Sequence, residues 1–128
     1  MRTFRALSDS EMEIMQVIWQ LGAPITTAQL RLLFAHKGWK IQTLATFLAR
    51  LVDKGALAVE KRKGANLYVP AVTELRYRRL EARHVIESQY NGSLPDFLSA
   101  YYGGRGMTLA EQEELAAWFH RETSMDLL

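Results

Sequence analysis

The sequence has no cysteine in its 128 residues. Disulfides, thiolate catalysis and cysteine-ligated zinc or copper are therefore excluded. It also has no apolar run approaching the roughly 20 residues that a membrane-spanning helix needs. Residues 1–5 lack the apolar stretch and the cleavage site of a secretory signal. We therefore expect a cytoplasmic, bacterial protein without a membrane partner.

Motifs of catalysis are missing as well. The sequence has no nucleophile elbow, phosphate-binding loop or metalloprotease signature. The three histidines, His36, His84 and His120, fall on different expected helices without the spacing of metal ligands. The run Gly103–Gly106 does not follow an expected strand, which favours a hinge over a phosphate cradle. We expect no enzyme, no metal site and no cofactor.

The charges are unevenly distributed, although the net charge is only +2. Residues 1–72 hold ten Lys/Arg and five Asp/Glu, whereas residues 73–128 hold six Lys/Arg and nine Asp/Glu. A basic first half suits contact with phosphates, and the acidic second half then has another role. Chance segregation of charges is the plainer alternative.

Three helices are expected in the first half. Ser8 and Glu11 form a capping box, after which apolar residues recur at helical spacing until Gly22. A second helix begins at residue 26 or 27 and ends near residues 37–38. Residues 23–25 between them form a tight connection or a very short strand. A third, strongly amphipathic helix spans residues 41–54.

The pattern then changes to a β-hairpin. Residues 56–62 and 67–70 flank residues 63–66, where Gly64 and Asn66 tolerate positive φ at a basic tip. Three helices followed by such a hairpin within about 70 residues predict a winged helix-turn-helix.

The second half is expected to be helical. Thr73 caps a long helix, Ser93 begins a shorter one, and Thr108 with Glu111 forms another capping box. The expected fold is thus mainly α with a small β-hairpin. A winged helix-turn-helix DNA-binding domain in residues 1–72 is followed by a helical dimerisation region in residues 73–128.

The third expected helix has a face that its leucines do not use. Gln42, Thr43 and Thr46 lie on this face, and Ala45 and Ala49 between them would allow close approach. A glutamine amide can bond adenine, and a threonine offers a hydroxyl and a methyl group. An ordinary solvated face is the alternative, but long Glu and Lys side chains are more typical there.

We therefore predict contacts with a double-stranded DNA operator. The predicted residues are Lys40, Gln42, Thr43, Thr46 and Arg50 of the helix, and Lys61, Arg62 and Lys63 of the wing. The wing residues would meet phosphates, which position a protein but carry no base information. An ordinary solvated hairpin tip is the alternative for the wing.

The tail is too apolar to be left exposed and too small to fold alone, which favours a homodimer. The predicted interface residues are Tyr77, Leu80, Leu94, Phe97, Leu98, Tyr101, Leu115, Trp118 and Phe119. Such a dimer would place two recognition helices about one DNA turn apart on a near-palindromic site. A winged-helix protein-interaction module that does not bind DNA is the alternative function.

Several segments resemble the penicillinase repressor (BlaI/MecI) family of bacterial transcriptional regulators. They are LSDSEMEIM at residues 7–15, VIW at 17–19, TLATFLARLVDKGAL at 43–57, YVP at 68–70 and GSL at 92–94. The resemblance implies a homodimeric repressor with its winged helix on a dyad-symmetric operator. Gln42, Thr43 and Thr46 fall on the recognition-helix positions of the family.

The sequence also departs from this family at three places. Lys40-Ile41 stands where members commonly have Ser-Pro, so the operator sequence does not carry over. Ala100-Tyr101 stands where a signalling protease cuts an Asn-Phe bond in the β-lactam regulators. The cysteine cluster of the copper-responsive members is missing. The inducing partner, a protease or a ligand, is therefore left open.

Overall fold

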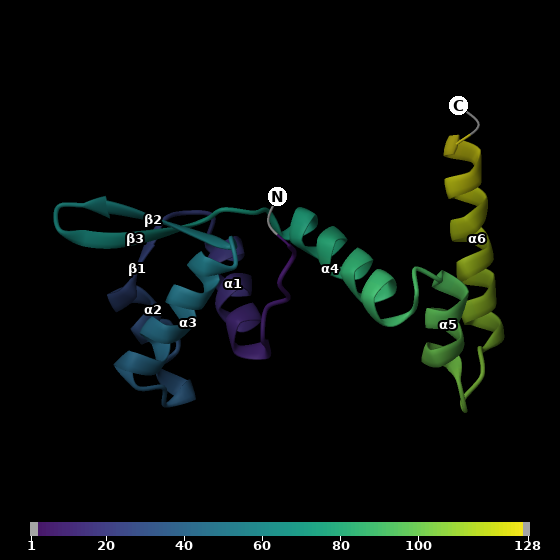
Figure 1. Cartoon of the computed structure of the whole chain (residues 1–128), viewed down its shortest axis with the longest axis horizontal. Helices are drawn as coiled ribbons and strands as arrows, with labels where there is room; N and C mark the ends of the chain where they lie inside the picture. The colour runs from purple at the N-terminus through teal and green to yellow at the C-terminus, as the bar shows by residue number, and fades with distance from the viewer. Residues whose placement is uncertain (1–2, 127–128) are drawn as a thin grey trace. The chain divides into compact units, whose positions relative to one another are not determined.

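The computed structural model describes residues 3–126, and the side chains of residues 3–123. The elements in chain order are α1 (Asp9–Leu21), β1 (Ile25–Thr26), α2 (Thr27–Leu33), the 3-10 helix η1 (Ala35–Lys37), α3 (Ile41–Asp53), β2 (Leu57–Arg62), β3 (Ala65–Pro70), α4 (Glu74–Gln89), α5 (Leu94–Tyr102) and α6 (Leu109–Asp126) (Figure 1). They form two compact units, Met1–Val85 and Ile86–Leu128. The units divide within α4, later than the expected boundary between residues 72 and 73.

The core of the N-terminal unit lies where α1, α2 and α3 pack on one another and on the sheet (Figure 1). Its buried residues are Ile14, Met15, Ile18, Ile25, Leu30, Phe34, Leu44, Leu48, Leu51, Ala56, Leu57 and Tyr68. The predicted capping box starts α1, since the Glu11 amide donates to Ser8 Oγ at 3.2 Å and the Ser8 amide donates to Glu11 Oε1 at 2.9 Å. The capping box and the stripe of buried apolar residues therefore both favour a helix over the same residues.

The sheet has three antiparallel strands in the order β1-β3-β2. Ile25 of β1 pairs with Tyr68 of β3, so the connection between α1 and α2 contains a very short strand. The hairpin turn is tighter than expected, because only Lys63 (φ 52°) and Gly64 (φ 78°) connect β2 to β3. Positive φ at both positions matches the twist of a two-residue hairpin. Asn66, expected in the turn, instead pairs with Lys61.

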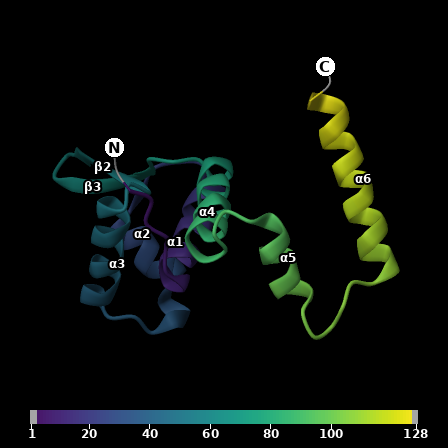
Figure 2. The ribbon, with the colours of Figure 1, turned by 45° about the vertical axis from the view of Figure 1, so that its right-hand side comes forward.

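The C-terminal helices begin at the predicted caps. Thr73 Oγ1 accepts from the Arg76 amide at 3.1 Å at the start of α4. Ser93 caps α5, and Thr108 and Glu111 bond reciprocally at the start of α6. Figure 2 shows α5 and α6 diverging from the loop that joins them. No helix within residues 3–126 is long and apolar enough to cross a membrane.

The loop between α5 and α6, expected to be a hinge, is held by Arg105. Its guanidinium donates to both Glu111 carboxylate oxygens, at 3.0 and 2.9 Å, and lies 5.4 Å from the centre of the Tyr102 ring. The Gly106 amide also donates to the Tyr102 carbonyl at 2.7 Å. The hydrogen bonds from Arg105 and Thr108 lower the pKa of Glu111 to about 2. The loop is therefore fastened to the first turn of α6.

Candidate nucleic-acid interface

Helix α3 has one buried face and one bare face. Leu44, Leu48 and Leu51 are at most 2% exposed and anchor the helix in the core. The opposite face carries the exposed residues Gln42, Ala45, Thr46, Ala49 and Arg50, with Thr43 half-buried at its edge. The side chains predicted to read DNA are thus turned outward, and only short residues lie between them.

Thr46 and Gln42 on this face differ in the hydrogen-bonding groups that remain available to a ligand. Thr46 Oγ1 donates its proton to the Gln42 carbonyl at 2.9 Å within the helix. The Thr46 hydroxyl can therefore still accept a hydrogen bond, while its methyl group supplies apolar contact. The side-chain amide of Gln42 has no hydrogen-bond partner in the described part of the chain. Its NH₂ group can therefore still donate, and its oxygen can still accept.

An aromatic stack positions the N-terminus of α3. The Trp39 ring lies 5.3 Å from Phe34 and 5.0 Å from Phe47, between the end of α2 and the inner face of α3. Lys37 lies over the same ring at 5.7 Å. The stack joins the two helices of the motif just before residue 40, where α3 begins. Sequence reasoning missed it, although aromatic residues on both sides of the turn were the available signal.

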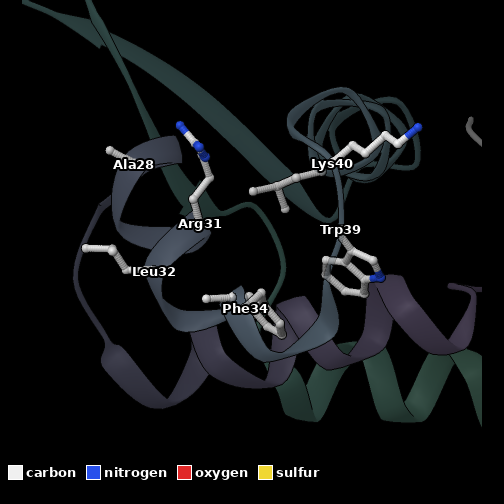
Figure 3. Close-up of a pocket in the computed structure, with 8 residues that line it drawn as sticks. Ala28, Arg31, Leu32, Phe34, Trp39 and Lys40 are labelled. Atoms are coloured by element: carbon white, nitrogen blue, oxygen red, sulfur yellow. The ribbon is translucent and has the colours of Figure 1, made fainter.

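A hollow of about 500 Å³ lies between α2 and the start of α3 (Figure 3). Arg31 and Lys40 line it from the two helices, with Trp39 and Phe34 beside them. Both cations are exposed, and neither has an acidic partner among the described residues. Arg31 was not predicted as a site residue. Its place on α2 next to the buried Leu30 could have indicated an outward-facing cation.

The wing is basic, but its three cations are not equivalent. Lys61, Arg62 and Lys63 are all exposed. Arg62 pairs with Glu60 of the same strand at 3.1 Å, whereas Lys61 and Lys63 have no ion-pair partner in the part of the chain that the structure describes. The unpaired positive charge of the wing therefore lies on the two lysines.

A buried ion pair holds the other end of α3. Glu11 is 1% exposed, and its carboxylate accepts from Lys54 Nζ at 2.6 Å. Burial opposes ionisation of Glu11, but the hydrogen bonds from Lys54 and Ser8 outweigh it and hold the pKa below its ordinary value. Arg5 pairs with Asp53, the last residue of α3. The helix is thus held at its end by α1 and the N-terminal segment, and at its start by the aromatic contacts with the end of α2.

The residues predicted for the dimer interface lie in two different environments. Tyr77 is 3% exposed inside the N-terminal unit, where its hydroxyl accepts from the Leu7 amide at 2.9 Å and donates to Glu81 at 3.2 Å. Tyr77 therefore has almost no surface to offer a second copy. Leu80 is half-buried in the same unit.

The other predicted interface residues lie on α5 and α6. Six of them, Leu94, Leu98, Tyr101, Leu115, Trp118 and Phe119, line one hollow of about 470 Å³ within the C-terminal unit. Phe97 does not line this hollow; its ring stacks on Tyr90 at 5.4 Å and meets the edge of Tyr101 at 6.4 Å. Within residues 3–123 no group of three His, Cys, Asp or Glu could hold a metal ion.

Three helices, a small antiparallel sheet and a basic two-stranded hairpin define a winged helix-turn-helix protein. The sequence model of the penicillinase repressor family matches residues 7–121, and the chain belongs to this family. It is 32% identical to the penicillinase repressor of Bacillus licheniformis over 94 residues, 73% of each chain. It is 33% identical over 69 residues to an uncharacterized 16.5 kDa protein of Latilactobacillus sakei, which covers 54% of this chain and 47% of that protein.

The fold has a solved relative as well. The solution structure of the DNA-binding domain of the repressor BlaI matches with a TM-score of 0.51 and 35% identity, over 58% of this chain and 90% of that domain. The predicted family and the winged-helix fold are thereby confirmed. The family, the Bacillus licheniformis relative and BlaI are all described as repressors, which confirms the prediction that the chain is not an enzyme.

Proposed function

We propose that this chain is a sequence-specific DNA-binding repressor that acts as a homodimer on a near-palindromic operator. The observation that carries the proposal is the bare, short-chain face of α3, flanked by unpaired cations on α2 and the wing. Membership of a repressor family supports it, as does the likeness to a DNA-binding domain. A cytoplasmic location, where the DNA lies, goes with the proposal.

Base readout would fall to the first two turns of α3. The major groove is about 12 Å wide and admits a helix. Ala45 and Ala49 leave room for the helix to approach the base edges. The free Gln42 amide suits adenine, and the Thr46 methyl group suits a thymine methyl, because its hydroxyl proton is already used within the helix. Thr43, half-buried at the edge of the face, would lie close to the sugar-phosphate backbone of the DNA.

Backbone contacts would fall to cations on both sides of this face. Arg31 and Lys40 line the hollow between α2 and α3, so a phosphate ridge passing there would lie within reach of both. In helix-turn-helix proteins the first helix of the motif crosses the backbone in this way. Lys61 and Lys63 would meet phosphates beside the wing. Such contacts set register without reading sequence.

A second copy of the chain is the partner proposed for α5 and α6. No described residue of the C-terminal unit is buried, and Tyr101, Trp118 and Phe119 are 63%, 43% and 47% exposed. Apolar side chains gathered in this way mark an interaction surface. A dimer would present two recognition helices about 34 Å apart, or a multiple of that distance. Bivalent attachment would raise the affinity well above that of one unit alone.

The test is selection of bound duplexes from a random pool, followed by titration of the selected site at several salt concentrations. A reader making about 6–10 phosphate contacts should lose roughly 10³–10⁵ in affinity between about 50 and 200 mM salt. Gln42→Ala and Thr46→Ala should each relax preference at one base pair by about 1–3 kcal/mol. Leu75→Ala, an exposed change on α4, is the matched control.

Two results would contradict the proposal. No enrichment of any duplex would favour a protein-interaction module over a DNA reader. Enrichment that Gln42→Ala and Thr46→Ala leave unaltered would move base readout to another surface.

A further inference from the structure

The N-terminal segment Thr3–Leu7 forms no helix or strand, yet it packs on two elements that are distant in sequence. On one side it contacts α4. The Phe4 ring lies 5.6 Å from the Tyr77 ring and 5.1 Å from the His84 ring. The Leu7 amide donates to the Tyr77 hydroxyl at 2.9 Å. We call this segment, residues 3–7, the N-terminal arm.

On its other side the arm contacts the end of the recognition helix. The Ala6 carbonyl accepts from Lys54 Nζ at 3.0 Å, and Arg5 pairs with Asp53. Lys54 also holds the buried Glu11 carboxylate, so the arm and α1 share one cation at the end of α3. The arm therefore lies between α3 and α4 and binds to both.

Two apolar side chains of the arm, Phe4 and Leu7, are half-buried against the helices, whereas Arg5 and Ala6 are exposed. A small cavity of about 70 Å³ lies among the arm, the turn after α3 and the start of α4, and its lining includes Phe4, Leu7, Gly55, Ala56 and Leu80. Truncation of Phe4 would enlarge this cavity and remove the ring contacts that hold the arm to α4.

The contacts of the arm matter because α4, on which it packs, belongs to both compact units. It runs without interruption from Glu74 in the N-terminal unit to Gln89 in the C-terminal unit. Its residues up to Val85 belong to the N-terminal unit, and the arm packs on two of them, Tyr77 and His84. Besides the arm, Trp19 holds this junction, since its Nε1 donates to the Val72 carbonyl at 2.9 Å and its ring lies 6.0 Å from Tyr77.

We propose that the N-terminal arm is a strap that sets the angle between α4 and the recognition helix, with Phe4 as its principal positioning residue. The inference rests on the proposed function, because the angle matters only when two recognition helices must fit one operator. Loosening the strap lowers the effective concentration of the second half-site interaction without altering either reading face. Phe4 lies outside the buried core cluster, so its removal leaves the core of the unit intact.

The experiment measures the affinity of the full-length protein for the selected dyad site and for a duplex carrying one half-site. Phe4→Ala should reduce dyad affinity by about tenfold or more while leaving half-site affinity within about twofold. Phe4→Leu, which keeps apolar bulk, should recover most of the loss. Tyr77→Phe, which removes only the hydroxyl bonded to Leu7, should act in the same direction and more weakly. Leu75→Ala, exposed on α4, should change neither affinity.

The outcomes are distinguishable. An unchanged dyad advantage in Phe4→Ala, with wild-type protein preferring the dyad, would overturn the strap and leave the proposed function standing. Equal losses on dyad and half-site would also overturn it, since they would mean damage to the reading unit itself. Wild-type protein that shows no dyad advantage at all would overturn both proposals.

Discussion

The two compact units of this chain differ in how far their apolar side chains are buried. The N-terminal unit holds every described hydrophobic residue that is buried, from Ile14 in α1 to Tyr77 in α4. The C-terminal unit has none buried in its described part, although it carries Trp118, Phe119 and several leucines and tyrosines. The difference teaches that the first unit is stabilised by its own core, whereas the second leaves the same kinds of residue exposed, where the proposed second copy would cover them.

Truncation of single leucines tests this difference between the two units most directly, because only a buried leucine should be costly to remove. Leu48→Ala in α3 removes a leucine that is 1% exposed and should cost about 2–5 kcal/mol of unfolding free energy. Leu109→Ala in α6, at 70% exposure, should stay within about 0.5 kcal/mol. Urea unfolding followed by circular dichroism measures both. Equal costs would mean that the C-terminal unit has a core comparable with that of the first.

The second prediction concerns the partner. Trp118→Ala should weaken self-association by about 2 kcal/mol or more, because a large aromatic anchor is lost from the hollow that α5 and α6 line. Light scattering over a dilution series should show monomers at concentrations where the proposed wild-type dimer persists. Leu32→Ala is the control, an 80% exposed leucine of the N-terminal unit, and should keep the dimer mass. A Trp118→Ala dimer of unaltered strength would remove α6 from the interface.

The third prediction is a pH effect on the stability of the first unit. Because the folded pKa of Glu11 lies below its ordinary value of 4.5, its contribution is complete above that value and is lost as pH falls through the folded pKa. Glu11→Gln should cost roughly 1.5–3 kcal/mol at neutral pH, the range for hydrogen bonds to charged groups. Its urea stability should also decline less steeply than that of wild-type protein in acid. Parallel profiles would contradict a structural role for the ionised carboxylate.

A surface pair supplies the control for that prediction. Glu13 pairs with Lys37 at 2.8 Å but remains 42% exposed. Glu13→Gln should therefore change stability by no more than about 1 kcal/mol, since exposed ion pairs contribute little.

The smallest expected effect concerns the salt dependence of DNA binding, which should change for a cation of the wing and not for one of the C-terminal unit. Lys61→Ala should reduce the slope of log affinity against log salt by about 1, as for one lost phosphate contact. Arg62→Ala should change it less, because Arg62 is already paired with Glu60. Arg121→Ala in the C-terminal unit should leave the slope unchanged. Equal slopes for Lys61→Ala and Arg121→Ala would remove the wing from the proposed interface.

Much of the fold could be predicted because its signals are local. Ser8, Thr73, Ser93 and Thr108 all cap helices as predicted, since each bonds a residue three positions along the chain. The bare face of α3 was likewise readable from helical spacing alone. The two-residue turn was missed because Lys63 takes a positive φ that its residue type does not announce.

The sequence by itself determined where the helices begin, which face of α3 is short-chained and to which family the chain belongs. Each of these depends on neighbours within a few positions or on motif order. Tertiary structure alone decided that Tyr77 is buried, that Arg31 and Lys40 line one hollow, and that the N-terminal arm joins α3 to α4. These features bring together residues far apart in the chain, and only the packing of whole elements selects which distant side chains meet.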